Sequence, residues 1–185
     1  LRGIRGLNAV VYSEHVVRFQ DLLKEVNPGY ESNLIHLPEV TVGTAMALED
    51  KVAKGESLFL VGDRPPASEN GRTVSVPFLG REAPFPMGPI FLAHLLQCPV
   101  YLFFCIKEGG AYRVHMEPFA DRIDLPRQGR EAALKAWVAR YAAAVEAHCR
   151  RAPFQWFNFY DFWGPGTAAP ASPPPPSPTP SPAAP

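Results

Sequence analysis

Asp63 and Arg64 are the residues of this 185-residue chain whose position most suggests chemistry. Only Gly62 separates them from the apolar run Ser57 to Val61, which predicts a strand buried on both faces of a parallel sheet. Ligands bind at the carboxyl ends of such strands, and the planar fork of an arginine suits a phosphate or another anionic headgroup. The alternative is an ordinary turn, in which the aspartate bonds its own backbone and the arginine is solvated.

Two predicted helix starts carry further candidate binding residues. His15 and Arg18 follow a predicted strand over residues 8–12, and a cation there could contact a headgroup or stabilise a developing oxyanion. Gly88 and Pro89 begin an apolar helix whose free N–H groups could face a phosphate. In both places the alternative is an ordinary helix start with no ligand.

Other kinds of reactive site are not indicated. Cys98, Cys105 and Cys149 lie far apart and form no CxxC pair, so neither a zinc site nor a disulfide framework is expected. No serine lies in a G-x-S-x-G segment, which argues against a thioesterase of the α/β-hydrolase type.

Composition limits the partners and divides the chain. The 18 basic and 18 acidic side chains cancel, which argues against a nucleic-acid-binding domain. No apolar run reaches the ~18–20 residues that span a bilayer. Residues 164–185 consist almost entirely of Pro, Ala, Ser, Thr and Gly, which predicts a disordered tail. Residues 1–163 are expected to form one domain.

The elements that must position the candidate residues alternate between strand and helix. This alternation predicts an α/β fold with a mainly parallel central sheet flanked by helices. Gly109 and Gly110 predict a hairpin near the end, and the apolar spacing over residues 130–149 predicts a long C-terminal helix. The expected strands are 8–12, 33–37, 57–61, 72–78, 99–106 and 112–117, and the expected helices are 15–26, 44–54, 88–97 and 130–149. A proline-fixed loop, stiffened by Pro84 and Pro86, is expected to lead into the helix at 88–97.

Five short segments carry a resemblance to a known family. They are Asp63-Arg64, Val76-Pro-Phe-Leu-Gly80, Gly88-Pro-Ile-Phe-Leu-Ala93, Pro99-Val-Tyr-Leu102 and Ala152-Pro-Phe-Gln-Trp-Phe157. In type and order they resemble motifs of the bacterial lipid A lauroyl/myristoyl acyltransferases, within the lysophospholipid acyltransferase superfamily. The resemblance extends from about Leu7 to Trp163.

The resemblance implies an enzyme of lipid biosynthesis. Such an acyltransferase moves a fatty acyl group from a thioester, on acyl carrier protein or coenzyme A, to a hydroxyl of a lipid or glycolipid acceptor. The resemblance implies a mechanism with no metal and no cofactor. It implies action at a membrane surface, on the cytoplasmic face of the bacterial inner membrane, with an anchor expected upstream of this chain.

The chain departs from the family at its reactive centre. The family uses a His-x4-Asp/Glu motif, in which the histidine is the general base. The five histidines here have other residues at the i+5 position, namely Gln20, Thr41, Pro99, Ala120 and Pro153. The catalytic residues are therefore unknown, and we expect an N-terminally truncated fragment that is inactive alone. A non-catalytic lipid- or partner-binding module is the alternative.

Overall fold

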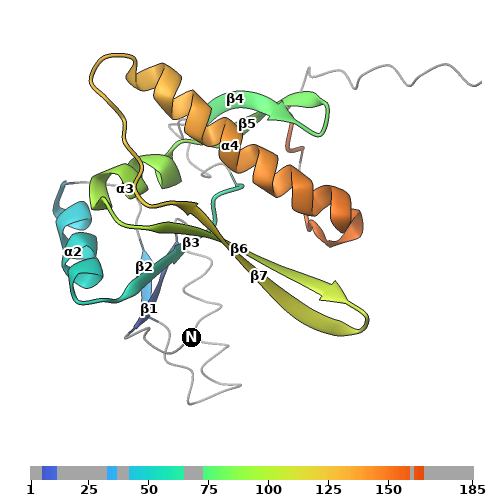
Figure 1. Cartoon of the computed structure of the whole chain (residues 1–185), viewed down its shortest axis with the longest axis horizontal. Coiled ribbons are helices and arrows are strands. Elements are labelled where there is room, and N and C mark those ends of the chain that lie inside the picture. The colour runs from blue at the N-terminus through green and yellow to red at the C-terminus, as the bar shows by residue number, and fades with distance from the viewer. Residues whose placement is uncertain (1–5, 12–32, 37–41, 65–72, 159–160, 165–185) are drawn as a thin grey trace, which may run out of the picture.

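The computed structural model describes residues 6–11, 33–36, 42–64, 73–158 and 161–164. Three short parallel strands form the N-terminal sheet, in the order β2-β1-β3. They are β1 (Leu7–Val11), β2 (Asn33–His36) and β3 (Ser57–Leu60). Helix α2 (Val42–Ala53) connects β2 to β3 and covers one face of this sheet, where its Leu48 packs with Val10 in a small core (Figure 1).

The first antiparallel hairpin consists of β4 (Thr73–Phe78) and β5 (Arg81–Pro86). Leu79 and Gly80 join the strands, and both have positive φ, 51° and 82°. Two such residues form the kind of turn whose twist matches that of the flanking strands. The sequence interpretation of the segment before residue 88 as a proline-fixed loop is therefore wrong for β5. Pro84 and Pro86 disguised the strand, but a two-stranded hairpin has an open edge where a residue without an N–H is tolerated.

Helix α3 (Gly88–Leu96) follows directly and links two cores. Its Ile90 belongs to the larger core and its Leu92 to the small core below α2. Leu95 is about half exposed, so the helix is covered on one side rather than all round as its composition suggested.

The second hairpin pairs β6 (Val100–Glu108) with β7 (Ala111–Ala120) across the predicted turn at Gly109 and Gly110. From Tyr101–Pro118 to the turn, side chains alternate between its two faces. The inner face includes Phe104, whose ring stacks on His148 with centroids 3.8 Å apart. The outer face carries the register pairs Tyr101–Pro118, Phe103–Met116, Cys105–Val114 and Lys107–Tyr112, all of them exposed.

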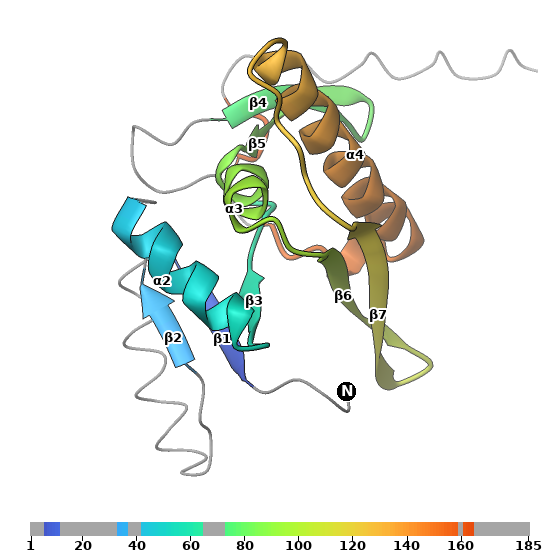
Figure 2. The same ribbon diagram turned by 60° about the vertical axis from the view of Figure 1, so that its left-hand side comes forward.

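Helix α4 (Arg130–Arg151) runs along both hairpins and organises the larger core (Figure 2). Its buried residues recur with helical spacing, as the sequence predicted. They pack against Val76, Phe78 and Phe85 of the first hairpin. Phe162 closes this core from the C-terminal side and is only 2% exposed. The buried residues of α4 are Leu134, Val138, Ala142, Val145 and Cys149.

The class of fold is mixed α/β, and the predicted hairpin and long helix are confirmed. The prediction of a mainly parallel central sheet is wrong for the described residues, which form three small sheets instead. Parallel pairing stops at β3 because two-residue turns, which can only join antiparallel neighbours, produce the later pairs. The strand at Ser57 to Val61 is also not covered on both faces, because Phe59 is 40% and Val61 51% exposed.

Candidate functional site

The end of β3 is held against α4 by a close backbone approach. A Cβ atom built on Gly62 would lie 2.9 Å from the hydroxyl oxygen of Tyr141 and 3.1 Å from its Cζ. Glycine is therefore the residue that fits between β3 and the tyrosine. Burial and the negative charge of Asp63 both raise the pKa of Tyr141, so its hydroxyl stays neutral.

Asp63 and Arg64 bind the closing aromatic segment of the chain. Trp156 donates its indole N–H to Oδ2 of Asp63 at 3.1 Å, and Arg64 donates to the carbonyl oxygen of Phe157 at 2.9 Å. Each pair is separated by 93 residues in sequence. We call these four residues the clasp, because they fasten the end of β3 to the segment after α4.

The same closing segment binds the edge of β6. Here η1 (Pro153–Gln155), a short 3-10 helix, places the Gln155 amide beside Lys107. The amide donates to the carbonyl oxygen of Lys107 at 2.9 Å and accepts its N–H at 2.7 Å, as a neighbouring strand would. The Pro-x-Gln-Trp segment thus joins β6, through Gln155, to β3, through Trp156.

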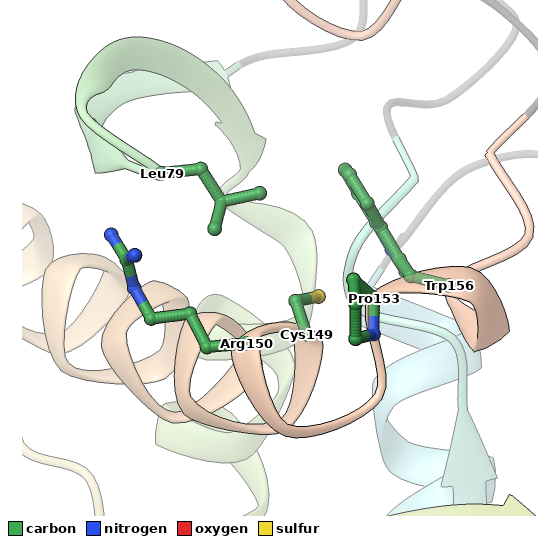
Figure 3. Close-up of a pocket in the computed structure, with 5 residues that line it drawn as sticks. All are labelled: Leu79, Cys149, Arg150, Pro153 and Trp156. Atoms are coloured by element: carbon green, nitrogen blue, oxygen red, sulfur yellow. The ribbon is translucent and has the colours of Figure 1, made fainter.

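A pocket with a volume of about 370 Å³ opens beside the clasp (Figure 3). Trp156 belongs to both the pocket and the clasp. The other walls come from the β4–β5 turn, from the end of α4 and from the first residue of η1. The complete lining is Leu79, Cys149, Arg150, Pro153 and Trp156. An apolar cavity with one cation at its rim suits an amphipathic ligand with a negative group.

The charge of Arg150 in the pocket lining is balanced by Glu146. Glu146 accepts the backbone N–H of Leu79 at 2.7 Å and forms an ion pair with Arg150, also at 2.7 Å. The hydrogen bond from Leu79, followed by that from Arg150, lowers the pKa of Glu146. At the pocket wall, burial first and then Asp63 and Glu146 raise the pKa of Cys149 to about 11. Its thiol is therefore neutral at physiological pH and is no nucleophile.

Two described histidines lie beside carboxylates of the second hairpin. One is His115, whose Nε2 lies 3.7 Å from Oε1 of Glu108. His148 on α4 and Glu117 on β7 form a dyad with 3.0 Å between Nε2 and Oε1, which their separation of 31 residues concealed from sequence analysis. Its other nitrogen, Nδ1, is buried without a hydrogen-bond partner, so it cannot reach a substrate hydroxyl. His94 lies near the carbonyl of Ile123, and its Nδ1 accepts the N–H of Leu125. Within the described ranges, no group of His, Cys, Asp and Glu could hold a metal ion.

Of the predicted site residues, Asp63 and Arg64 both bind the closing aromatic segment of the chain. Gly88 and Pro89 lie at the start of α3, and Pro89 occupies an early position there as expected. The hydrogen bonds of the clasp go to Trp156 and Phe157 rather than to α3. His15 and Arg18 lie outside the described residues.

Sequence reasoning missed the pocket residues. Trp156 was recognised as part of a motif, but its link to Asp63 has no local signal. The sequence pattern places Cys149 in a helix and Leu79 in a motif and assigns nothing to Arg150, because the pocket arises only where these elements meet.

Comparison with known proteins adds no relative. Neither the models of protein families nor the curated proteins yield a match to this chain. In the part of the chain that the structure describes, no helix has both the length and the apolar character needed to cross a bilayer.

Proposed function

We propose that this chain is part of an acyltransferase that acts on a lipid. In the proposed reaction, the hydroxyl oxygen of a lipid or glycolipid acceptor attacks the carbonyl carbon of an acyl thioester. An ester bond forms, the carbon–sulfur bond breaks, and the thiol of acyl carrier protein or coenzyme A leaves. A general base takes the proton of the hydroxyl, and no metal or cofactor takes part.

The observation that carries the proposal is the clasp. Both the Asp63-Arg64 and the Pro-x-Gln-Trp segments belong to the resemblance, and they are far apart in sequence. Two hydrogen bonds nevertheless join them directly, at 3.1 and 2.9 Å. Segments that act together at one site are expected to meet in this way.

The pocket beside the clasp provides additional support. Its apolar wall, formed by Leu79, Pro153 and Trp156, suits an alkyl chain. Arg64 is exposed and has five N–H donors, so it can bind a headgroup while one of them holds Phe157. Under this proposal Arg64 is a substrate-contacting residue.

In this proposal the general base lies outside the described residues. None of the five histidines has an acid at i+5, and Nδ1 of His148 is buried. We therefore propose that the chain supplies the lipid-contacting part of the enzyme and is inactive alone. A membrane surface on the cytoplasmic side of a bacterial inner membrane is the proposed place of action.

A non-catalytic lipid- or partner-binding module is the second candidate. One observation favours it: both Asp63 and Arg64 donate or accept a hydrogen bond within the protein, as purely structural residues do. Under this alternative the pocket binds a ligand and catalyses no reaction.

The test is an acyl-transfer assay on the complete product of the gene, with labelled acyl carrier protein thioester and a lipid acceptor extract. We expect labelled lipid from the wild type and at least about a tenfold loss in Arg64→Ala, roughly the loss of one charged contact. Arg127→Ala, an exposed arginine in the connection between β7 and α4, is the matched control and should transfer normally. Transfer that Arg64→Ala leaves unchanged would reject the site. No transfer by a folded wild type across several donors would favour the binding module.

A further inference from the structure

The outer face of the β6–β7 hairpin is apolar and uncovered. Its large side chains are between about half and three-quarters exposed, from Phe103 at 47% to Tyr112 at 75%. The exposed apolar members are Tyr101, Phe103, Tyr112, Val114 and Met116. A contiguous patch of this kind marks an interaction site in a water-soluble fold.

The patch continues onto the parallel sheet. The ring of Phe59 on β3 meets that of Phe103 edge to face, with centroids 5.7 Å apart. Phe59 is itself 40% exposed. The apolar surface therefore extends from the free arm of the hairpin to the sheet. In two views the turn of this arm points away from the sheet and from α3 (Figures 1 and 2).

The charges of the hairpin are segregated between its faces. Lys107 is the one charged residue among the register pairs of the outer face. Both acids of β6 and β7 lie on the inner face, where Glu108 pairs with Arg151 and Glu117 with His148. The outer face thus combines apolar side chains with a cation and presents no carboxylate of the two strands.

We propose that the outer face docks on an anionic lipid surface. Tyr101 and Tyr112 lie at opposite ends of the face, and tyrosine is favoured at the boundary between acyl chains and water. Phe103, Val114 and Met116 lie between them and would enter the apolar region. Lys107, whose ammonium lies 5.9 Å from the centre of the Tyr112 ring, would meet lipid phosphates. A second copy of the face offers no carboxylate to that lysine, which favours the lipid.

The inference rests on the proposed function in one respect, because an acyltransferase must reach its lipid acceptor at a surface. It adds the element that makes the contact. The pocket and the clasp lie next to this element, because Gln155 of η1 bonds the backbone of Lys107.

The test is co-sedimentation of the full chain with vesicles, either of phosphatidylcholine alone or of phosphatidylcholine and phosphatidylglycerol in equal parts. We expect binding to the anionic vesicles that weakens about tenfold or more in Val114→Ser/Met116→Ser, because two apolar side chains no longer leave water. Phe154→Ser is the matched control, since Phe154 is 93% exposed but belongs to η1 and not to the register pairs of the outer face. Unchanged thermal unfolding would show that each variant is folded.

The charge is tested separately with Lys107→Glu. This variant should lose binding to the anionic vesicles. Lys135→Glu makes an equal change of charge at an exposed position of α4 and should retain binding. No binding by the wild type, or equal binding by wild type and hairpin variants, would overturn the proposal. A dimer that forms without vesicles and is dissociated by the hairpin substitutions would also overturn the proposal.

The two proposals can fail independently. Vesicle binding without acyl transfer would reject the proposed acyltransferase activity and support the docking face. Acyl transfer to a detergent-dispersed acceptor without vesicle binding would support the activity and reject the docking face.

Discussion

Single residues of the clasp act on several neighbours at once. Asp63 accepts the indole N–H of Trp156, and its charge adds to burial in raising the pKa values of Tyr141 and Cys149. A nearby carboxylate disfavours ionisation of the Tyr141 hydroxyl and of the Cys149 thiol, so both groups stay neutral. The hydrogen bond of Arg64 to Phe157 likewise positions a cation at the surface without using all its donors.

Glu146 offers a pH-dependent test at this scale. Its lowered pKa means that the stability it contributes is present above its ordinary value of 4.5 and is lost as pH falls through the lowered pKa. Glu146→Ala is therefore expected to reduce the free energy of unfolding by about 1 kcal/mol at neutral pH, the low end for a charged hydrogen bond because the group stays partly in water. The difference from wild type should shrink in acid.

Urea unfolding at neutral pH and near pH 3 measures this difference. Asp121→Asn, on an exposed residue after β7, serves as the control and should stay close to wild type at neutral pH. A deficit of Glu146→Ala that is equally large in acid would contradict the electrostatic role.

Turns and close approaches determine how the elements pair. The hairpins β4–β5 and β6–β7 both close through two residues with positive φ. The close approach of β3 to α4 depends instead on empty space at Gly62. Glycine is thus used for two different reasons, one conformational and one steric.

Two alanine substitutions separate these reasons. Gly80→Ala meets nothing within 4 Å, but φ is 82°, so we expect a loss of about 1–2 kcal/mol in the free energy of unfolding from backbone strain alone. Gly62→Ala places its Cβ 2.9 Å from Tyr141, and we expect about 1–3 kcal/mol from overpacking.

Double variants with Tyr141→Phe distinguish the two mechanisms in urea unfolding. Removal of the hydroxyl should recover part of the Gly62→Ala loss, whereas the effect of Gly80→Ala should simply add. Equal coupling in both cycles would show that the contact with Tyr141 is not what requires Gly62.

At the scale of the whole molecule, α3 and α4 connect parts that are not paired by sheet hydrogen bonds. Ile90 and Leu92 of α3 reach into separate cores, and α4 packs on the first hairpin and stacks on the second. Phe78 lies at the centre of an aromatic cluster with Phe85, Trp156 and Phe162. The segment after α4 is therefore part of the main core.

A pair of truncations tests where the folded domain ends. A chain that ends at Gly164 is expected to unfold at the wild-type temperature. Residues 165–185 contain only Pro, Ala, Ser, Thr and Gly, a composition that cannot form a hydrophobic core. A chain that ends at Asp161 loses Phe162, and we expect a loss of about 3–5 kcal/mol, as for removal of a buried phenylalanine. Calorimetry measures both. A large loss in the longer truncated chain would contradict the predicted boundary.

Local pattern was sufficient for most elements of this protein. The spacing of apolar residues located α4, and two adjacent glycines located the β6–β7 turn, because periodicity and positive φ are properties of neighbouring residues. The same reasoning identified Asp63 and Arg64 as the polar end of β3. It failed at β5, where prolines masked a strand that only pairing with β4 makes favourable.

Tertiary structure alone decided which segments meet. The link from Asp63 to Trp156 spans 93 residues, and the pocket walls come from a turn, a helix end and a 3-10 helix. It also decided that the parallel sheet stops at three strands and that one face of the β6–β7 hairpin stays exposed. These outcomes depend on packing between distant elements, which no spacing of neighbouring residues encodes.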